Sequence, residues 1–105
     1  MAHILDRLFD TIASRRGADP AKSYTAQLLG QGAERCAKKF GEEAVEAVIA
    51  AVKGDQAEIT AESADVLYHL LVLWAHRELP PADVWAALAR REGLSGVEEK
   101  RQRKE

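Results

Sequence analysis

Apolar residues recur every three or four positions along most of this 105-residue chain, which is the period of a helix with one buried face. No segment shows the apolar and polar alternation of a half-buried strand. The pattern predicts helices over residues 3–16, about 33–53 and 58–76, a short helix after Ser23, and another that begins at Pro81. We therefore expect an all-α domain, a bundle of four to five helices.

Residues that begin or end helices lie at the boundaries of these segments. Ser23 and Asp55 precede helical patterns, and their side-chain oxygens can cap the free backbone N–H groups of a first turn. Gly54 lies between the two long segments, where it permits the sharp reversal of an antiparallel pair. Pro80 and Pro81 end one helix, and Pro81 suits the first turn of the next.

Each long helix carries an apolar stripe that we expect to pack against the other helix. The first stripe consists of Val45, Val48, Ile49 and Val52, and the second of Ile59, Val66, Leu67, Leu70 and Trp74. Acidic residues border both stripes in this interpretation. Packing of the two stripes would then carry the acids to the rim of the interface.

Two acidic pairs lie on the long helices. They are Glu43 with Glu46 and Glu62 with Asp65, and Glu42 directly precedes the first pair. Each pair is spaced i, i+3, which places both side chains on one helical face. Carboxylates that converge from two helices repel one another, and a cation between them removes this repulsion. Oxygen ligands favour Mg²⁺ or Mn²⁺, so the pattern indicates chemistry on a phosphate ester or phosphoanhydride.

Simpler explanations exist for these residues. Acidic pairs are common on solvated helix faces. Lys39 lies four residues before Glu43 and suits an ordinary ion pair, whereas Lys38 is rotated about 100° away from that face. His69 follows Asp65 by one turn, and we interpret it as a hydrogen-bond partner of a carboxylate and not as a metal ligand.

Three segments together resemble a known family. They are SYTAQLL at residues 23–29, KKFGEEAVE at 38–46 and ESADVLYHLLVL at 62–73. These segments resemble the phosphoribosyl-ATP pyrophosphohydrolases of histidine biosynthesis, which belong to the MazG-like all-α nucleotide pyrophosphohydrolases. The paired ExxE and ExxD motifs identify the superfamily, and the residues around them point to the histidine-pathway branch. The resemblance covers roughly residues 3 to 95.

The resemblance implies a reaction and a set of metal ligands. Phosphoribosyl-ATP and water would give phosphoribosyl-AMP and pyrophosphate, with Mg²⁺, or alternatively Mn²⁺, as the cofactor. The implied metal ligands are Glu43, Glu46, Glu62 and Asp65. Glu42 and Glu43 are the implied catalytic residues, and Glu42 either ligates the metal or accepts the proton of the attacking water.

A further set of residues is expected to contact the substrate. The resemblance implies that Lys22, Ser23 and Tyr24 help to hold a phosphate or the ribose, although helix capping by Ser23 and anchoring by Tyr24 explain the segment equally well. Helical geometry adds Lys39, because its ammonium group falls near the Glu43 face and can offset triphosphate charge.

Composition narrows the class of function. The net charge is −2 and the basic residues are scattered, so we expect neither a nucleic-acid nor a membrane partner. The single cysteine, Cys36, cannot form an internal disulfide, and no apolar run has membrane-spanning length, which favours a cytoplasmic protein. The length suits one domain at residues 1–94, followed by a charged tail at 95–105 that we expect to be disordered.

We also expect a homodimer that completes a larger helical bundle. A chain of 11.5 kDa gains burial from a second copy. Trp74, Trp85 and the leucine-rich residues 66–73 offer more apolar surface than four short helices readily cover.

Two other functions stay open on the sequence alone. A housekeeping nucleotide pyrophosphohydrolase of the same superfamily would share the metal site and act on ordinary or damaged nucleoside triphosphates. A non-catalytic helical interaction module would carry the same acids as a solvated rim.

Overall fold

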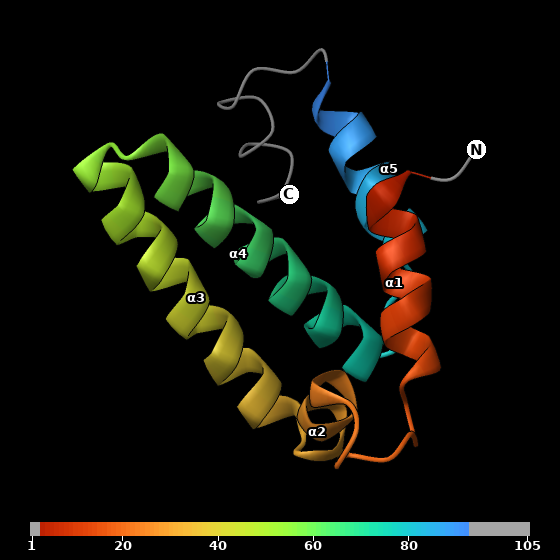
Figure 1. Ribbon diagram of the computed structural model, residues 1–105. Coiled ribbons are helices and arrows are strands. Elements are labelled where there is room, and N and C mark those ends of the chain that lie inside the picture. The colour runs from red at the N-terminus through yellow and green to blue at the C-terminus, as the bar shows by residue number, and fades with distance from the viewer. Residues whose placement is uncertain (1–2, 93–105) are drawn as a thin grey trace.

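The computed structural model describes residues 3–92, and this part of the chain contains five helices and no strand. They are α1 (Ile4–Ser14), α2 (Tyr24–Gly30), α3 (Ala33–Lys53), α4 (Gln56–His76) and α5 (Pro81–Arg91). The long helices α3 and α4 run side by side in opposite directions, α1 lies across α4 from α3, and α2 packs where α3 begins and α4 ends (Figure 1). The predicted all-α bundle is confirmed, and the expected tail at 95–105 lies outside the described residues.

The helix boundaries follow the local chemistry that the sequence predicted. The Ser23 hydroxyl accepts a hydrogen bond from a backbone N–H in the first turn of α2, and the Asp55 carboxylate accepts two in the first turn of α4. Gly54 ends α3 with a φ of 79°, a conformation that favours glycine. His3, to which the sequence analysis gave no role, caps α1 through its Nδ1 atom.

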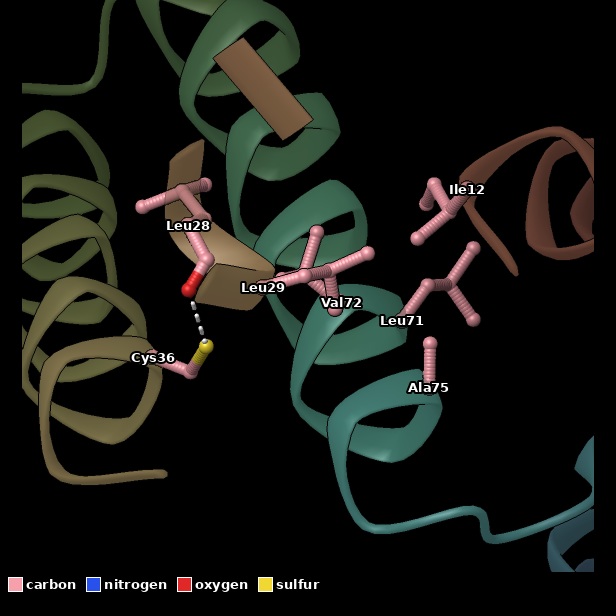
Figure 2. Packing of buried hydrophobic residues seen from close by; sticks show 7 residues of the cluster. All are labelled: Ile12, Leu28, Leu29, Cys36, Leu71, Val72 and Ala75. Carbon is pink, nitrogen blue, oxygen red and sulfur yellow. Dashed lines mark hydrogen bonds between the residues drawn. The ribbon is translucent and has the colours of Figure 1, made fainter. Parts of the chain in front are cut away.

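The core forms where α4 meets α1, α2 and the beginning of α3. Its buried residues are Ile12, Leu28, Leu29, Cys36, Leu71, Val72 and Ala75 (Figure 2). Leu71 and Ile12 lie between α4 and α1, while Val72 lies beside Leu29 of α2. The Cys36 thiol donates a hydrogen bond to the Leu28 carbonyl at 3.2 Å, which ties α3 to α2. Burial raises the pKa of this thiol, so Cys36 is a protonated core residue.

The packing of α3 against α4 differs from the prediction. The side chains of the first stripe, Val45, Val48, Ile49 and Val52, are between 54% and 83% exposed. The better-covered positions of α3 include Cys36, Glu43, Ala47 and Ala50. At 100° per residue, the stripe lies roughly opposite Glu43 on the helix. The predicted packing of the two stripes, with the acids at its rim, is therefore wrong.

The physical reason is the size of the residues on the two faces of α3. Ala47 and Ala50 are small and let the backbones of α3 and α4 approach closely, whereas the branched side chains on the opposite face would hold them apart. Leu67 of the second stripe is also exposed, at 43%. Acidic residues consequently lie between the two helices, and large apolar residues lie outside.

The two tryptophans hold α5 within the chain. The Trp85 indole N–H donates a hydrogen bond to the Asp6 carboxylate at 2.8 Å, and its ring packs edge-on against Trp74 with centroids 5.8 Å apart. The exposed apolar surface that we expected around these tryptophans is instead concentrated on α3. None of the described helices has the length and apolar character needed to span a membrane.

Candidate metal centre

Three carboxylates meet between α3 and α4. Oxygen atoms of Glu43 on α3 and of Glu62 and Asp65 on α4 all lie within 4.8 Å of one another. The i, i+3 spacing puts Glu62 and Asp65 on the same side of α4, and Glu43 approaches them from the small-residue face of α3. The structure thus brings together three of the four residues that the resemblance implies as metal ligands.

The buried oxygens of this group are suited to a hard cation. Among residues 3–92, Glu43 Oε2 and Glu62 Oε2 are buried and have no hydrogen-bond partner. An anionic oxygen that is removed from water without a partner is destabilising, and a cation between the two helices would satisfy both atoms. Several carboxylate oxygens in one place suit Mg²⁺ or Mn²⁺ better than softer metals. The donor set therefore fits the implied metal.

Glu46 and Glu42 lie at the edge of this group. Glu46 is exposed and is not among the mutually close oxygens, but its carboxyl group approaches that of Glu43. This approach is the largest cause of a raised pKa at Glu43, and burial is the second. Glu42 is about half exposed, with its Oε1 atom 3.6 Å from the Lys39 Nζ atom, so it lies farther from the centre.

Lys39 is the cation of the site. Its Nζ atom lies 3.6 Å from Glu43 Oε1, so the predicted ion pair is confirmed. The pKa of Lys39 is raised, first by the nearby Tyr24 phenol and further by Glu42 and Glu43, while burial acts in the opposite direction. The ammonium group is therefore charged at neutral pH. Lys38 is exposed, as its rotation around the helix predicts.

His69 lies beside the carboxylates on α4. It is 5% exposed, and its Nε2 atom is 3.9 Å from Glu43 Oε1 on the facing helix. This distance is too long for the hydrogen bond that we predicted between His69 and a carboxylate. Burial lowers the pKa of His69 more than Glu43 raises it, so the imidazole is neutral at neutral pH.

The segment before α2 contributes one residue to the surroundings of the site. The Tyr24 ring meets the His69 ring edge-on, with centroids 6.3 Å apart, and about half of Tyr24 is exposed. The Ser23 hydroxyl is occupied as the cap of α2. Lys22 is exposed, and its backbone N–H donates to the Asp19 carbonyl in the turn before α2. Of the three implied substrate contacts in this segment, the structure brings Tyr24 against the site.

Two further residues lie next to the site. Thr25 belongs to the resembling segment at residues 23–29, part of which was expected to contact the substrate, and Tyr68 belongs to the segment at 62–73 but was given no role of its own. Thr25 Oγ1 and the Tyr68 hydroxyl form a hydrogen bond of 2.5 Å that joins α2 to α4. The Tyr68 ring also packs edge-on against His69, with centroids 4.9 Å apart. A signal for Tyr68 was present, because it follows Asp65 by three residues and so lies on a neighbouring part of the same helical face.

A separate cavity of about 460 Å³ lies between α1 and the connection from α4 to α5. Its lining includes Phe9, Leu79 and Arg16, and the Arg16 guanidinium donates a hydrogen bond to the Ala75 carbonyl near the end of α4. None of the carboxylates of the metal centre lines this cavity. The candidate site is therefore identified by its converging carboxylates and not by the size of a cavity.

Comparison with known proteins gives a consistent result. The family model described as phosphoribosyl-ATP pyrophosphohydrolase matches residues 5–92, which include all three converging carboxylates. A protein of Dinoroseobacter shibae is 62% identical over 95% of this chain and 98% of its own length. Proteins of Azospirillum brasilense and Paracoccus denitrificans are 58% and 61% identical, over 98% and 95% of this chain and 93% of each relative. All three relatives are named phosphoribosyl-ATP pyrophosphatase.

The raised pKa of Glu43 predicts how the stability of the metal-free protein depends on pH. Because the folded-state pKa lies above the ordinary value of 4.5, the protonated acid favours folding and the charged form opposes it. The Glu43 contribution should therefore diminish as pH rises from about 4.5 through the raised pKa. Glu43→Gln removes this titration. The free energy of unfolding of the variant, relative to that of the wild type, should therefore increase as pH rises across this interval.

Urea unfolding in the presence of a chelator, repeated at a series of pH values, measures this difference. Glu58→Gln, which removes a carboxylate of α4 outside the metal centre, is the matched control and should not show the same gain. Parallel stability profiles for Glu43→Gln and the wild type would contradict the prediction.

Proposed function

The chain belongs to the phosphoribosyl-ATP pyrophosphohydrolase family and is a hydrolase of a phosphoanhydride, and we propose that it converts phosphoribosyl-ATP to phosphoribosyl-AMP and pyrophosphate with the help of Mg²⁺. The observation that carries the metal requirement is the convergence of Glu43, Glu62 and Asp65 oxygens within 4.8 Å. We place the enzyme in the cytoplasm. A role in histidine biosynthesis suits this compartment, and so does a single, buried cysteine, Cys36, because the cytoplasm keeps thiols reduced.

In this proposal the carboxylates divide into ligands and neighbours. Glu43, Glu62 and Asp65 hold the cation, and Glu46 supports the site from beside Glu43. When bound, the cation supplies charge neutralisation on the triphosphate and on the leaving pyrophosphate. The buried oxygens Glu43 Oε2 and Glu62 Oε2 support the assignment, because no hydrogen-bond partner within residues 3–92 already occupies them.

The residues around the ligands act on the substrate and on water. Lys39 offsets phosphate charge with an ammonium group that is already held at the edge of the site by Glu42 and Glu43. Tyr24 lies edge-on to His69 and is about half exposed, so its phenol hydroxyl can donate to a phosphate oxygen. Glu42 lies outside the ligand group and is half exposed, so we assign to it the proton of the attacking water.

The alternatives are less well supported. A non-catalytic interaction module requires the acids to be a solvated rim, whereas the Glu43 side chain is only 12% exposed and lies between α3 and α4. A housekeeping nucleotide pyrophosphohydrolase would use the same metal centre, so substrate preference separates it from this proposal.

Pyrophosphate release from phosphoribosyl-ATP tests the proposed reaction. We expect turnover with Mg²⁺, loss of turnover when a chelator is added, and recovery when Mg²⁺ is restored in excess. The same assay with ATP, dATP and dUTP should give much lower kcat/KM values. Comparable kcat/KM values for these nucleotides would favour the housekeeping function, and no release from phosphoribosyl-ATP would contradict the proposal.

The two neighbouring lysines provide a test of the phosphate contact. Lys39→Ala should lower kcat/KM by about tenfold or more, because the triphosphate loses a charged partner. Lys38→Ala removes the same charge from an exposed position of the same helix and should stay near the wild-type value. Steady-state kinetics of both variants decide this, and equal losses would show that Lys39 has no special role.

We further propose that two copies of the chain form a homodimer through the exposed stripe of α3. The stripe presents Val45, Val48, Ile49 and Val52 on successive turns of a 21-residue helix, and each is more than half exposed in the single chain. A second copy can present the same stripe across a two-fold axis, so that one patch covers the other. Burial of four branched side chains would contribute several kcal/mol per chain, at roughly 1.5–3 kcal/mol for each full burial.

Size-exclusion chromatography with light scattering should therefore give a dimer at micromolar concentration. Val48→Asp places a charge in the middle of the stripe and should yield a monomer, because an unpaired charge is costly to bury. Thr11→Asp, at an exposed position of α1, is the control and should remain dimeric. A monomeric wild type would rule out this assembly.

A further inference from the structure

We propose that the hydroxyl groups of Thr25 and Tyr68 form a positioning pair that holds Tyr24 at the phosphate side of the metal centre. The inference rests on the proposed function, and it adds two residues that do not themselves contact the substrate. Thr25 directly follows Tyr24 in α2, and Tyr68 directly precedes His69 in α4. The pair therefore joins the two helices at the point where Tyr24 meets His69.

The short helix α2 cannot hold its own orientation. It has seven residues, which is too short for a helix to be stable by itself, so tertiary contacts must place it. Ala26, Leu28 and Leu29 are buried and fix how closely α2 approaches its neighbours. Apolar contacts of this kind have no directional preference, and the hydrogen bond from Cys36 to Leu28 restrains α2 near the end that is remote from Tyr24. The hydrogen bond between Thr25 and Tyr68 is also directional, and it supplies the restraint at the end of α2 that carries Tyr24.

Tyr68 is a suitable fixed point for the orientation of α2. It is part of the 21-residue α4, which also carries two of the three converging carboxylates. Burial raises the pKa of its phenol, so the hydroxyl keeps its proton at neutral pH and remains available for the bond to Thr25. Its ring packs edge-on against buried His69, which limits how far the phenol can move. The hydrogen bond thus fixes the position of α2 relative to α4, the helix that carries two of the three acids.

The pair of hydroxyl groups controls the position of Tyr24. Tyr24 lies edge-on to His69, whose Nε2 atom is 3.9 Å from Glu43 Oε1, and the same Glu43 oxygen pairs with the Lys39 ammonium. About half of Tyr24 is exposed, so its hydroxyl and the Lys39 ammonium can both donate to a phosphate from the open side. The carboxylates belong to α3 and α4, and loss of this one hydrogen bond leaves the core contacts between α2 and these helices in place. Loss of the pair should therefore weaken phosphate binding and leave metal binding intact.

Two conservative variants test this division. Tyr68→Phe and Thr25→Val each remove one hydroxyl and keep the shape of the side chain. Each should raise the KM for phosphoribosyl-ATP about threefold to tenfold, which is the effect expected for one hydrogen bond, with kcat changed less than about twofold. The affinity of the free protein for Mn²⁺ should be unchanged. Together the two substitutions should have no larger effect than either alone, because they break the same bond.

A background that lacks Tyr24 separates positioning from a general loss of stability. In Tyr24→Ala, adding Tyr68→Phe should not raise KM further, whereas its effect on the Tm should persist. Calorimetric titration with pyrophosphate in the presence of Mg²⁺ gives the same comparison without turnover, and it should show weaker binding in Tyr68→Phe only when Tyr24 is present. An equal loss of affinity with and without Tyr24, or no loss in either single variant, would overturn the inference. Failure of the wild type to hydrolyse phosphoribosyl-ATP would count against the proposed function instead, and pyrophosphate binding would still test the pair.

Discussion

Carboxylates on α3 and α4 repel one another, and the packing of the other helices has to offset this repulsion. Glu43, Glu62 and Asp65 approach one another between the two longest helices of residues 3–92, and two of their oxygens are buried with no hydrogen-bond partner in that part of the chain. Like charges at this distance oppose the packing of the helices that carry them. The pair must therefore be held together by contacts elsewhere and by a cation at the centre.

The core supplies those other contacts at one end of the helix pair. Leu71 and Val72 anchor α4 to α1 and α2, and Cys36 ties the start of α3 to α2 through the Leu28 carbonyl (Figure 2). The inner face of α3 is then free to carry acids and alanines, and its large apolar residues lie on the outer face. A charged site inside a small chain and an apolar surface outside it are thus two consequences of one arrangement.

The sequence predicted the helices well because their signals are local. Ser23, Asp55 and Gly54 act through backbone groups within a few residues, and the ion pair of Lys39 depends only on helical spacing. The face of α3 that turns inward was predicted wrongly, because apolar periodicity identifies an apolar face of a helix but does not tell what covers that face. The contact between Thr25 and Tyr68 joins residues that are distant in sequence, so no local pattern predicts it.

The carboxylates between α3 and α4 should bind a divalent cation, and Mn²⁺ titration followed by electron paramagnetic resonance measures this binding. The wild type should bind Mn²⁺ in competition with Mg²⁺. Glu62→Gln should lose most of this affinity, and Glu58→Gln, which changes an exposed carboxylate one turn earlier in α4, should bind like the wild type. Equal affinities in all three proteins, or no saturable binding to the wild type, would contradict the account.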